Sequence, residues 1–533
     1  MTFTAPHVDY AGLSPVIALT AGICLVLVGA VLSGPSRQRA VVSIISLAAL
    51  AAAAGLCIWQ WGTREDLVAG ALRLDELGLA GALIAILSAA LVIPLSWRDP
   101  AAERPGEEAR HGEFQALLLS SVLGMTLLAQ AQNLVAFFVS LELLSVPLYV
   151  LCGSALRRAS SLESGLKYLI VGSLGSATLL YGLALIYGGS GSTDFGGIRD
   201  GIGSGLADDP LVLMGIALAG TGLAFKISIA PFHQWTPDVY QGAPTPVTAF
   251  MAVATKAAAF CVFVRFFEVA LGPAVDNWQP ALAVLAAVSI AVGNIGALGQ
   301  DSLKRLLGYS GIAQAGYMLV GLVAASELGI NALVFYLAAY ALMNLAAFAV
   351  IVVRERETTW GDDIKAVQGM GRDRPELAWP LTISMLALAG LPATAGFMGK
   401  LYLIEAAVDA DYTWLGVAIA IGTMISLAYY LRVVAAVWMR PSAEPRAPEP
   451  AGVPAMAGGS PETDEDQTPE ERPETARDRD PAPAAPAPKG TRCLAILVPA
   501  VLTAGATVFF GVIPTPLVDW ASHAGGALAS FLP

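Results

Sequence analysis

Apolar residues arrive along the chain in continuous blocks of about 20, the length that crosses the hydrocarbon core of a bilayer as a helix. The blocks do not alternate between polar and apolar positions, which excludes a membrane β-barrel. We expect an all-α polytopic membrane protein. Its spans, about fourteen by the length criterion, are residues 14–33, 40–60, 75–96, 114–132, 134–154, 163–187, 211–235, 244–268, 280–299, 303–324, 329–353, 379–406, 412–439 and 493–513.

Composition agrees with this pattern. The chain has 533 residues, of which 56% are hydrophobic and 14% charged. Charged residues make up roughly a quarter of a soluble protein. No basic region precedes the first block, so we expect that block to be a retained span and not a signal peptide.

The distribution of charge predicts how the spans are oriented, because cytoplasmic loops are enriched in Lys and Arg. Loops after odd-numbered spans are rich in Lys and Arg, whereas loops after even-numbered spans are mostly acidic. Arg64, Arg73 and Arg199 are the exceptions among the acidic loops. Both termini are therefore expected on the outer side. The basic residues are spread singly, which argues against nucleic-acid binding. Loops after odd-numbered spans hold Arg37, Arg39, Arg98, Arg104, Arg110, Arg157, Arg158, Lys304, Arg305, Arg354, Arg356, Lys365, Arg372, Arg374 and Arg440.

The stretch 441–491 differs from the rest, being rich in Pro, Ala, Glu and Asp and almost free of large apolar residues. Such a segment buries too little surface to offset its ordering entropy, so we expect a disordered, acidic cytoplasmic linker. Residues 492–533 then form a last span and a tail.

Two spans contain helix breakers. Span 7 has Pro231 and Pro237, and span 12 has Pro392 and Gly396. Interrupted helices at corresponding places in two halves are a sequence indication of a transport site near the middle of the membrane. The breaks lie five spans apart, which predicts two five-helix repeats, at 114–268 and 280–440, after three N-terminal helices in 1–113.

Ionisable residues inside the spans are costly and therefore informative. Four of them form a series along the chain: Glu142, Lys226, Lys256 and Lys400. The alternative for each is a structural ion pair or a side chain that reaches the interface. Lys256 has about a dozen apolar-span residues on either side, a distance that a lysine stem does not bridge easily.

The chemistry that fits this series is proton transfer. Burial disfavours an ammonium and a nearby carboxylate favours it, so a lysine whose glutamate partner moves can release and recapture a proton. Glu142 and Lys226 would form such a switch. His233 beside the first break, and Lys167 with Glu163 four residues earlier, are supporting relay candidates, each with an equally good structural interpretation.

No metal or cofactor site is indicated. The five cysteines lie in or beside different apolar blocks and form no CxxC pair, and His233 is the single histidine near a span. Iron–sulfur clusters and haem require more ligands than this.

Four segments carry a resemblance to a known family. Residues 161–173 read SLESGLKYLIVGS, residues 226–260 read KISIAPFHQWTPDVYQGAPTPVTAFMAVATKAAAF, residues 301–322 read DSLKRLLGYSGIAQAGYMLVGL, and residues 390–406 read GLPATAGFMGKLYLIEA. They resemble the antiporter-like, proton-conducting subunits of respiratory complex I. The likeness covers about residues 114–440. The form PDVYQGAPTPVTAF sets the chain apart from subunits L and M, and the lysine at position 400 differs from M-like subunits, which tend to have glutamate there.

The resemblance implies inverted five-helix repeats, each with a broken helix, in a bacterial plasma-membrane subunit of NADH-quinone oxidoreductase, a proton-translocating enzyme. It implies proton transfer along Glu142, Lys226, Lys256 and Lys400. FMN, iron–sulfur clusters and quinone would lie on other subunits, with membrane-arm partners of the M, L, K, J, A and H types. Gln314, where some relatives have His, and Glu405 depart from the pattern.

Other functions remain open. The nearest is a subunit of a multisubunit Na⁺/H⁺ antiporter or a membrane-bound hydrogenase, which share the same core. A solute transporter and a structural scaffold are further alternatives, although a transporter would gather its charges in one pocket, whereas here they form a series.

Overall fold

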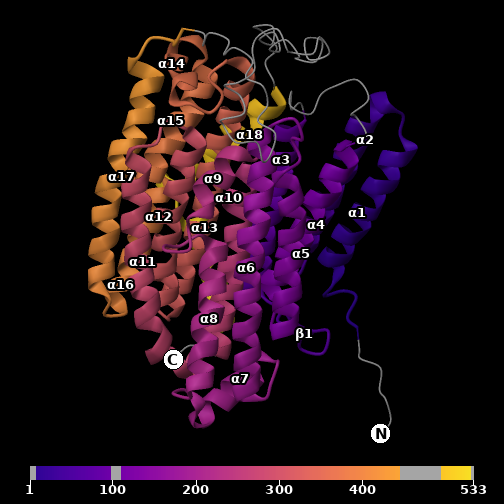
Figure 1. The fold of residues 1–533 in the computed structure, drawn as a ribbon, viewed down its shortest axis with the longest axis vertical. Coiled ribbons are helices and arrows are strands. Elements are labelled where there is room, and N and C mark those ends of the chain that lie inside the picture. Colours follow the sequence, from indigo (N-terminus) through magenta and orange to yellow (C-terminus); the bar gives the residue numbers. More distant parts are fainter. Residues whose placement is uncertain (1–7, 98–109, 445–493, 530–533) are drawn as a thin grey trace, which may run out of the picture.

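The computed structural model describes residues 8–97, 110–444 and 494–529. Long helices run side by side through one bundle, with α1 and α2 at one edge and α16 and α17 at the other (Figure 1). The predicted linker at 441–491 falls almost entirely outside the described residues. The first elements are α1 Ser14–Leu32, α2 Pro35–Trp59, β1 Glu65–Leu67, β2 Leu72–Leu74, α3 Glu76–Ser96, α4 Arg110–Gln130, α5 Leu134–Cys152, α6 Ala159–Ser190 and α7 Phe195–Gly201.

The second part of the chain repeats this pattern of long helices. Its elements are α8 Pro210–Ile227, α9 Trp235–Gly242, α10 Thr245–Val264, α11 Val275–Leu298, α12 Leu303–Val323, α13 Glu327–Glu357, α14 Met370–Asp373, α15 Pro375–Ala389, α16 Ala395–Asp409, α17 Thr413–Met439, α18 Leu494–Val512 and α19 Thr515–Leu528. Short π- and 3₁₀-helical turns connect some of them, at Ile202–Leu206, Arg265–Ala270, Gly272–Ala274 and Ile364–Val367.

The predicted number of crossings is confirmed. Thirteen helices of the described chain are long and apolar enough to span a bilayer. The remaining predicted span, 379–406, is divided into α15 and α16, each of 15 residues and thus too short to span alone. The strands β1 and β2 form one small antiparallel hairpin outside the helices.

Both predicted breaks are present. Ser228 ends α8 in the left-handed conformation, and α9 begins at Trp235 after a short loop containing Pro231. Gly390, with φ of +81°, ends α15, and the Thr394 side chain caps the first turn of α16. In the series α4–α10 and α11–α17, the broken helix is the fourth long element in each case.

The core lies along α10, α12 and α13. Every residue of α10 is buried. Small residues let neighbouring helices approach closely: a Cβ on Gly182 of α6 would lie 2.4 Å from the backbone nitrogen of Ala219 in α8, and one on Gly293 of α11 would lie 2.3 Å from that of Ala313 in α12. Such contacts replace the hydrophobic effect as the packing force between helices in lipid.

Candidate proton-transfer site

The break in the first series positions Lys226 in the last turn of α8, with its side chain 4% exposed. The ammonium nitrogen Nζ donates to Ser145 Oγ at 2.7 Å and to the Tyr168 hydroxyl at 3.4 Å. The C-terminal end of a helix carries partial negative charge, so it favours a cation there. Lys226 is therefore held by neutral oxygens and by a helix end.

Glu142 does not contact Lys226 directly. Among the described residues, no carboxylate lies within 4.0 Å of the Lys226 ammonium, and Glu142 Oε1 is buried without a hydrogen-bond partner. Ser145 follows Glu142 by one turn of α5 and itself donates to the Leu141 carbonyl. In place of the predicted Glu142–Lys226 ion pair, the Lys226 ammonium contacts the Ser145 hydroxyl. Ser145 was missed because sequence spacing does not show which face of α5 meets α8.

Aromatic rings enclose this end of Lys226. The Tyr168 ring lies 5.6 Å from Nζ, stacks on Trp235 with centroids 4.7 Å apart, and meets Tyr149 edge-on at 4.8 Å. Trp235 is the first residue of α9 and donates from its indole nitrogen to the Phe225 carbonyl of α8. The cage therefore connects both halves of the broken helix to α5 and α6.

Lys256 lies in the middle of α10 and is 1% exposed. Its ammonium donates to the Gly311 carbonyl of α12 and lies 5.6 Å from the Tyr340 ring centroid. A Cβ on Gly311 would lie 2.9 Å from Lys256 Nζ and 3.1 Å from the Tyr340 hydroxyl oxygen. Since all of α10 is buried, the geometry rules out the alternative in which Lys256 reaches an interface.

Lys400 lies on α16, 4% exposed, and its ammonium points back across the second break. Nζ donates to the Leu388 carbonyl of α15 at 3.0 Å and lies 5.0 Å from the Tyr317 ring centroid. Leu388 is the penultimate residue of α15. Lys226 precedes its break and Lys400 follows its own, yet both ammonium groups lie at the C-terminal end of the first half-helix.

Buried polar side chains of three helices, α12, α13 and α17, gather beside Lys400. Gln314 donates to the Leu388 carbonyl at 3.3 Å, so Lys400 and Gln314 share one acceptor. The Gln314 amide also donates to the Tyr430 hydroxyl at 3.4 Å and accepts from the Tyr336 hydroxyl. Tyr430 in turn pairs with Ser310, the neighbour of Gly311. This polar cluster of Ser310, Gln314, Tyr336 and Tyr430 lies between the contacts of Lys256 and Lys400.

The supporting relay candidates are arranged differently. Lys167 is 45% exposed and pairs with Glu163 at 2.5 Å and with Asp238 at 3.4 Å. Arg305 reaches the same Asp238 carboxylate at 2.5 Å. Lys167 thus belongs to a partly exposed ion network connecting α6, α9 and α12, which favours the structural interpretation. His233 lies in the loop after Pro231, partly buried, with Nδ1 buried and unpartnered among the described residues.

One buried lysine was placed in a loop by sequence reasoning. Lys304 lies in the first turn of α12, 3% exposed, and donates to the Ala243 carbonyl at 3.0 Å and to Thr245 Oγ1 at 3.2 Å. Glu355 lies 3.6 Å from its ammonium. Its position at the end of a predicted span gave no sign of this burial. Glu405, by contrast, is exposed and is not a partner of Lys400.

Comparisons with known proteins cover the part of the chain that contains these residues. A family model described as NADH:quinone oxidoreductase/Mrp antiporter, TM, matches residues 131–426. NADH-quinone oxidoreductase subunit N of Trichlorobacter lovleyi is 39% identical over 430 residues, which is 80% of this chain and 87% of that protein. NADH-quinone oxidoreductase subunit N 1 of Herpetosiphon aurantiacus is 39% identical over 455 residues, 84% of this chain and 91% of that protein.

Solved structures show the same fold. A chain of respiratory complex I from Thermus thermophilus with bound aureothin matches with a TM-score of 0.73 and 32% identity, over 95% of this chain and 98% of that one. A chain of the Mrp complex from Dietzia sp. DQ12-45-1b matches with a TM-score of 0.77 and 22% identity, over 98% and 97% of the two chains. At that identity the second match shows the fold alone.

Proposed function

The chain belongs to the NADH:quinone oxidoreductase/Mrp antiporter transmembrane family, among relatives named subunit N of NADH-quinone oxidoreductase, and we propose that it translocates protons for that enzyme. The observation that carries the proposal is the set of three nearly buried lysines, Lys226, Lys256 and Lys400, whose ammonium groups are held by neutral oxygens. In the described chain none of the three has a carboxylate within 4.0 Å.

Neutral partners suit a residue that must change its protonation state. A buried ion pair is costly to break, because removing one partner leaves an uncompensated charge. A lysine that donates to a hydroxyl or a carbonyl loses one hydrogen bond when it becomes a neutral amine, and no opposite charge is stranded. Arginine could not serve, because it stays protonated in proteins.

In this proposal the position of the Glu142 carboxylate controls whether Lys226 holds its proton. Its unpartnered Oε1 lies one helical turn from Ser145, which contacts Lys226. A rotation of Glu142 toward Lys226 would stabilise the ammonium, and its withdrawal would release the proton toward Lys256. The polar cluster then continues from Gly311 to Lys400, with the Gln314 amide holding the Tyr336 and Tyr430 hydroxyls. His233 is a further relay position beside the first break.

The arrangement of the chain in the membrane and in its complex is part of the proposal. We place 114–268 and 280–440 as inverted repeats, with both termini on the outer side of a bacterial plasma membrane and the acidic linker in the cytoplasm. FMN, iron–sulfur clusters and quinone belong to other subunits, with M-, L-, K-, J-, A- and H-type subunits as membrane partners. The identity to subunit N relatives favours this assembly over a Na⁺/H⁺ antiporter.

The test is NADH-driven proton uptake by inverted membrane vesicles carrying Lys226→Ala, Lys256→Ala or Glu142→Gln. Each variant should lower uptake while the complex remains assembled. Lys365→Ala is the control, because Lys365 is exposed outside the spans. Normal uptake in all three variants would refute the mechanism. Isolation of the chain in an assembly without flavin and iron–sulfur subunits would favour the antiporter.

A further inference from the structure

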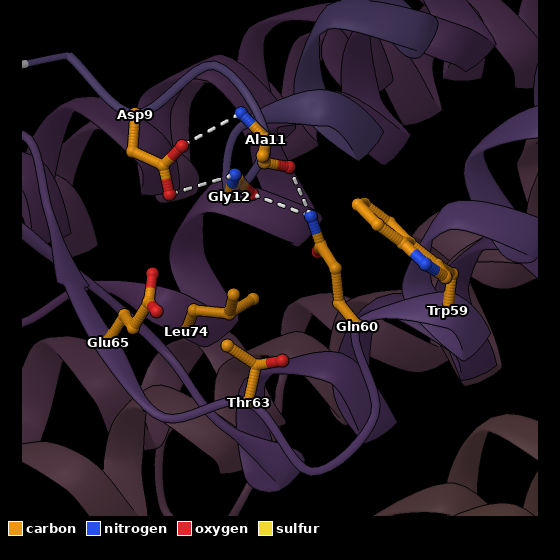
Figure 2. Close-up of a pocket in the computed structure, with 8 residues that line it drawn as sticks. All are labelled: Asp9, Ala11, Gly12, Trp59, Gln60, Thr63, Glu65 and Leu74. Carbon is orange, nitrogen blue, oxygen red and sulfur yellow. Dashed lines mark hydrogen bonds between the residues drawn. The ribbon is translucent and has the colours of Figure 1, made fainter.

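A pocket of about 220 Å³ lies where α1 begins and α2 ends, beside the β1–β2 hairpin (Figure 2). None of the proton-transfer residues described above lines this pocket. It is lined by Asp9, Ala11, Gly12, Trp59, Gln60, Thr63, Glu65 and Leu74.

The buried polar group in this pocket is Gln60, which is 4% exposed. Its amide nitrogen donates to the carbonyls of Ala11 and Gly12 and to Ser14 Oγ at 3.1 Å. Its amide oxygen Oε1 is buried and has no hydrogen-bond partner among the described residues. Buried acceptors are normally paired, so this oxygen is open to a donor that the described part of the chain does not supply.

The charges around the pocket select the kind of donor. The lining residues include the carboxylates of Asp9 and Glu65 and contain no Lys or Arg. Asp9 is oriented by the backbone N–H groups of Ala11 and Gly12, at 2.9 and 3.1 Å, which leaves its oxygens further acceptor capacity. The nearby Arg64 is engaged with Glu76 at 2.9 Å. The site therefore fits a cationic hydrogen-bond donor such as a primary ammonium.

The surroundings of the pocket indicate a lipid. Trp59 at its edge is 68% exposed, and Ile58 before it is 64% exposed, as are several apolar side chains along α1. Exposed tryptophan at the end of a span is typical of the membrane–water interface. An ammonium can also contact the face of an indole ring favourably. A lipid with its chains on α1 and α2 would bring its headgroup to the level of this pocket.

We propose that this pocket binds the primary ammonium of an ethanolamine phospholipid, through Gln60 Oε1, Glu65 and Asp9. The lipid's acyl chains lie against the exposed apolar faces of α1 and α2. Trimethylation of the ammonium removes its three donors, so a choline headgroup cannot satisfy the Gln60 oxygen.

The test uses the purified whole complex in lipid nanodiscs, with photoactivatable acyl chains on either an ethanolamine or a choline phospholipid. Mass spectrometry measures crosslinking to α1 and α2 peptides. The ethanolamine lipid should crosslink about tenfold more than the choline lipid, and Glu65→Gln should reduce this difference, as expected for losing a hydrogen bond to a charged group. Asp66→Asn is the matched control, because the adjacent Asp66 does not line the pocket.

Three results would overturn the proposal. They are equal crosslinking of the two lipids in the wild type, an unchanged preference in Glu65→Gln, and loss of the preference when free ethanolamine is added at millimolar concentration. The last would assign the pocket to a small soluble amine.

Discussion

The three central lysines share one local environment. Each ammonium donates to a neutral oxygen, and each lies between 5.0 and 5.6 Å from the centroid of a tyrosine ring. Cation–π contacts contribute about 0.5–2 kcal/mol. This is enough to help hold an ammonium, and it is lost at a smaller cost than a buried ion pair when the lysine becomes neutral. We infer that these sites are built to tolerate both protonation states. The pairs are Lys226 with Tyr168, Lys256 with Tyr340, and Lys400 with Tyr317.

Ser145 should matter as much as the glutamate beside it. A hydrogen bond to a charged group is worth about 1.5–3 kcal/mol, so Ser145→Ala should slow NADH-driven proton uptake about tenfold. Ser120→Ala is the control, since the Ser120 hydroxyl donates to the carbonyl of Ala116 in its own helix. Wild-type uptake in Ser145→Ala would mean that this hydroxyl does not hold Lys226 in the working enzyme.

Gly311 should be sensitive to the addition of one methyl group. Its Cβ would lie 2.9 Å from Lys256 Nζ, too close for the ammonium to keep its present place. We expect Gly311→Ala to lower the number of protons taken up per NADH oxidised. Gly55→Ala in α2, where no described atom lies within 4 Å of the new Cβ, should behave as wild type. Equal stoichiometry in both variants would contradict the assigned position of Lys256.

At the scale of elements, the broken helices bring lysines from different sequence positions to equivalent places. Lys226 belongs to the end of α8, whereas Lys400 starts from α16 and reaches the end of α15. Both ammonium groups thus lie where unpaired carbonyls and the negative end of a half-helix are available. The break supplies a partner for a cation without introducing a second charge.

Gly396 maintains the second break through close packing. A Cβ there would lie 2.0 Å from the Ala387 carbonyl oxygen and 2.8 Å from Met343 Sδ. Overpacking of this kind costs about 1–3 kcal/mol, so Gly396→Ala should reduce the amount of assembled complex and its thermal stability. Gly505→Ala in α18 has no described atom within 4 Å of its Cβ and provides the comparison. Equal assembly of the two variants would show that α15 and α16 can separate freely.

Much of this arrangement could be predicted from the sequence, for identifiable reasons. Apolar blocks, Pro392 and the isolated lysines are local signals, and they gave the spans, the second break and the main residues of the site. Ser145, Tyr336 and Tyr430 could not be found in this way, because their roles arise from contacts between helices distant in sequence. A serine or tyrosine in an apolar span is too common to stand out until its neighbours are known.

At the scale of the whole molecule, the two ends of the bundle differ in character. Trp61 after α2 stacks on Trp520 of α19 with ring centroids 5.9 Å apart, so the N- and C-terminal helices meet at one end. The β1–β2 hairpin and α7 lie at that same end (Figure 1). The segment between α13 and α14, which holds Lys365, lies at the opposite end of the bundle (Figure 1). This separation agrees with the charge bias of the sequence.

Labelling from one side of the membrane tests this orientation. Ser204→Cys, exposed near α7, should react with an impermeant maleimide in right-side-out vesicles. Lys365→Cys should react in inverted vesicles instead. The wild type corrects for the native cysteines, of which Cys24 is exposed and Cys57, Cys152 and Cys261 are buried. Reversed labelling would contradict the outer placement of the termini.

The most direct test of proton transfer through the lysines is Lys256→Arg. Arginine keeps the positive charge in a residue with several donors, but it does not release its proton. The assembled complex carrying Lys256→Arg should lose most of its NADH-driven proton uptake, as the complex carrying Lys256→Ala should. Full proton uptake with arginine at position 256 would show that a fixed charge is sufficient there, and would contradict proton transfer through Lys256.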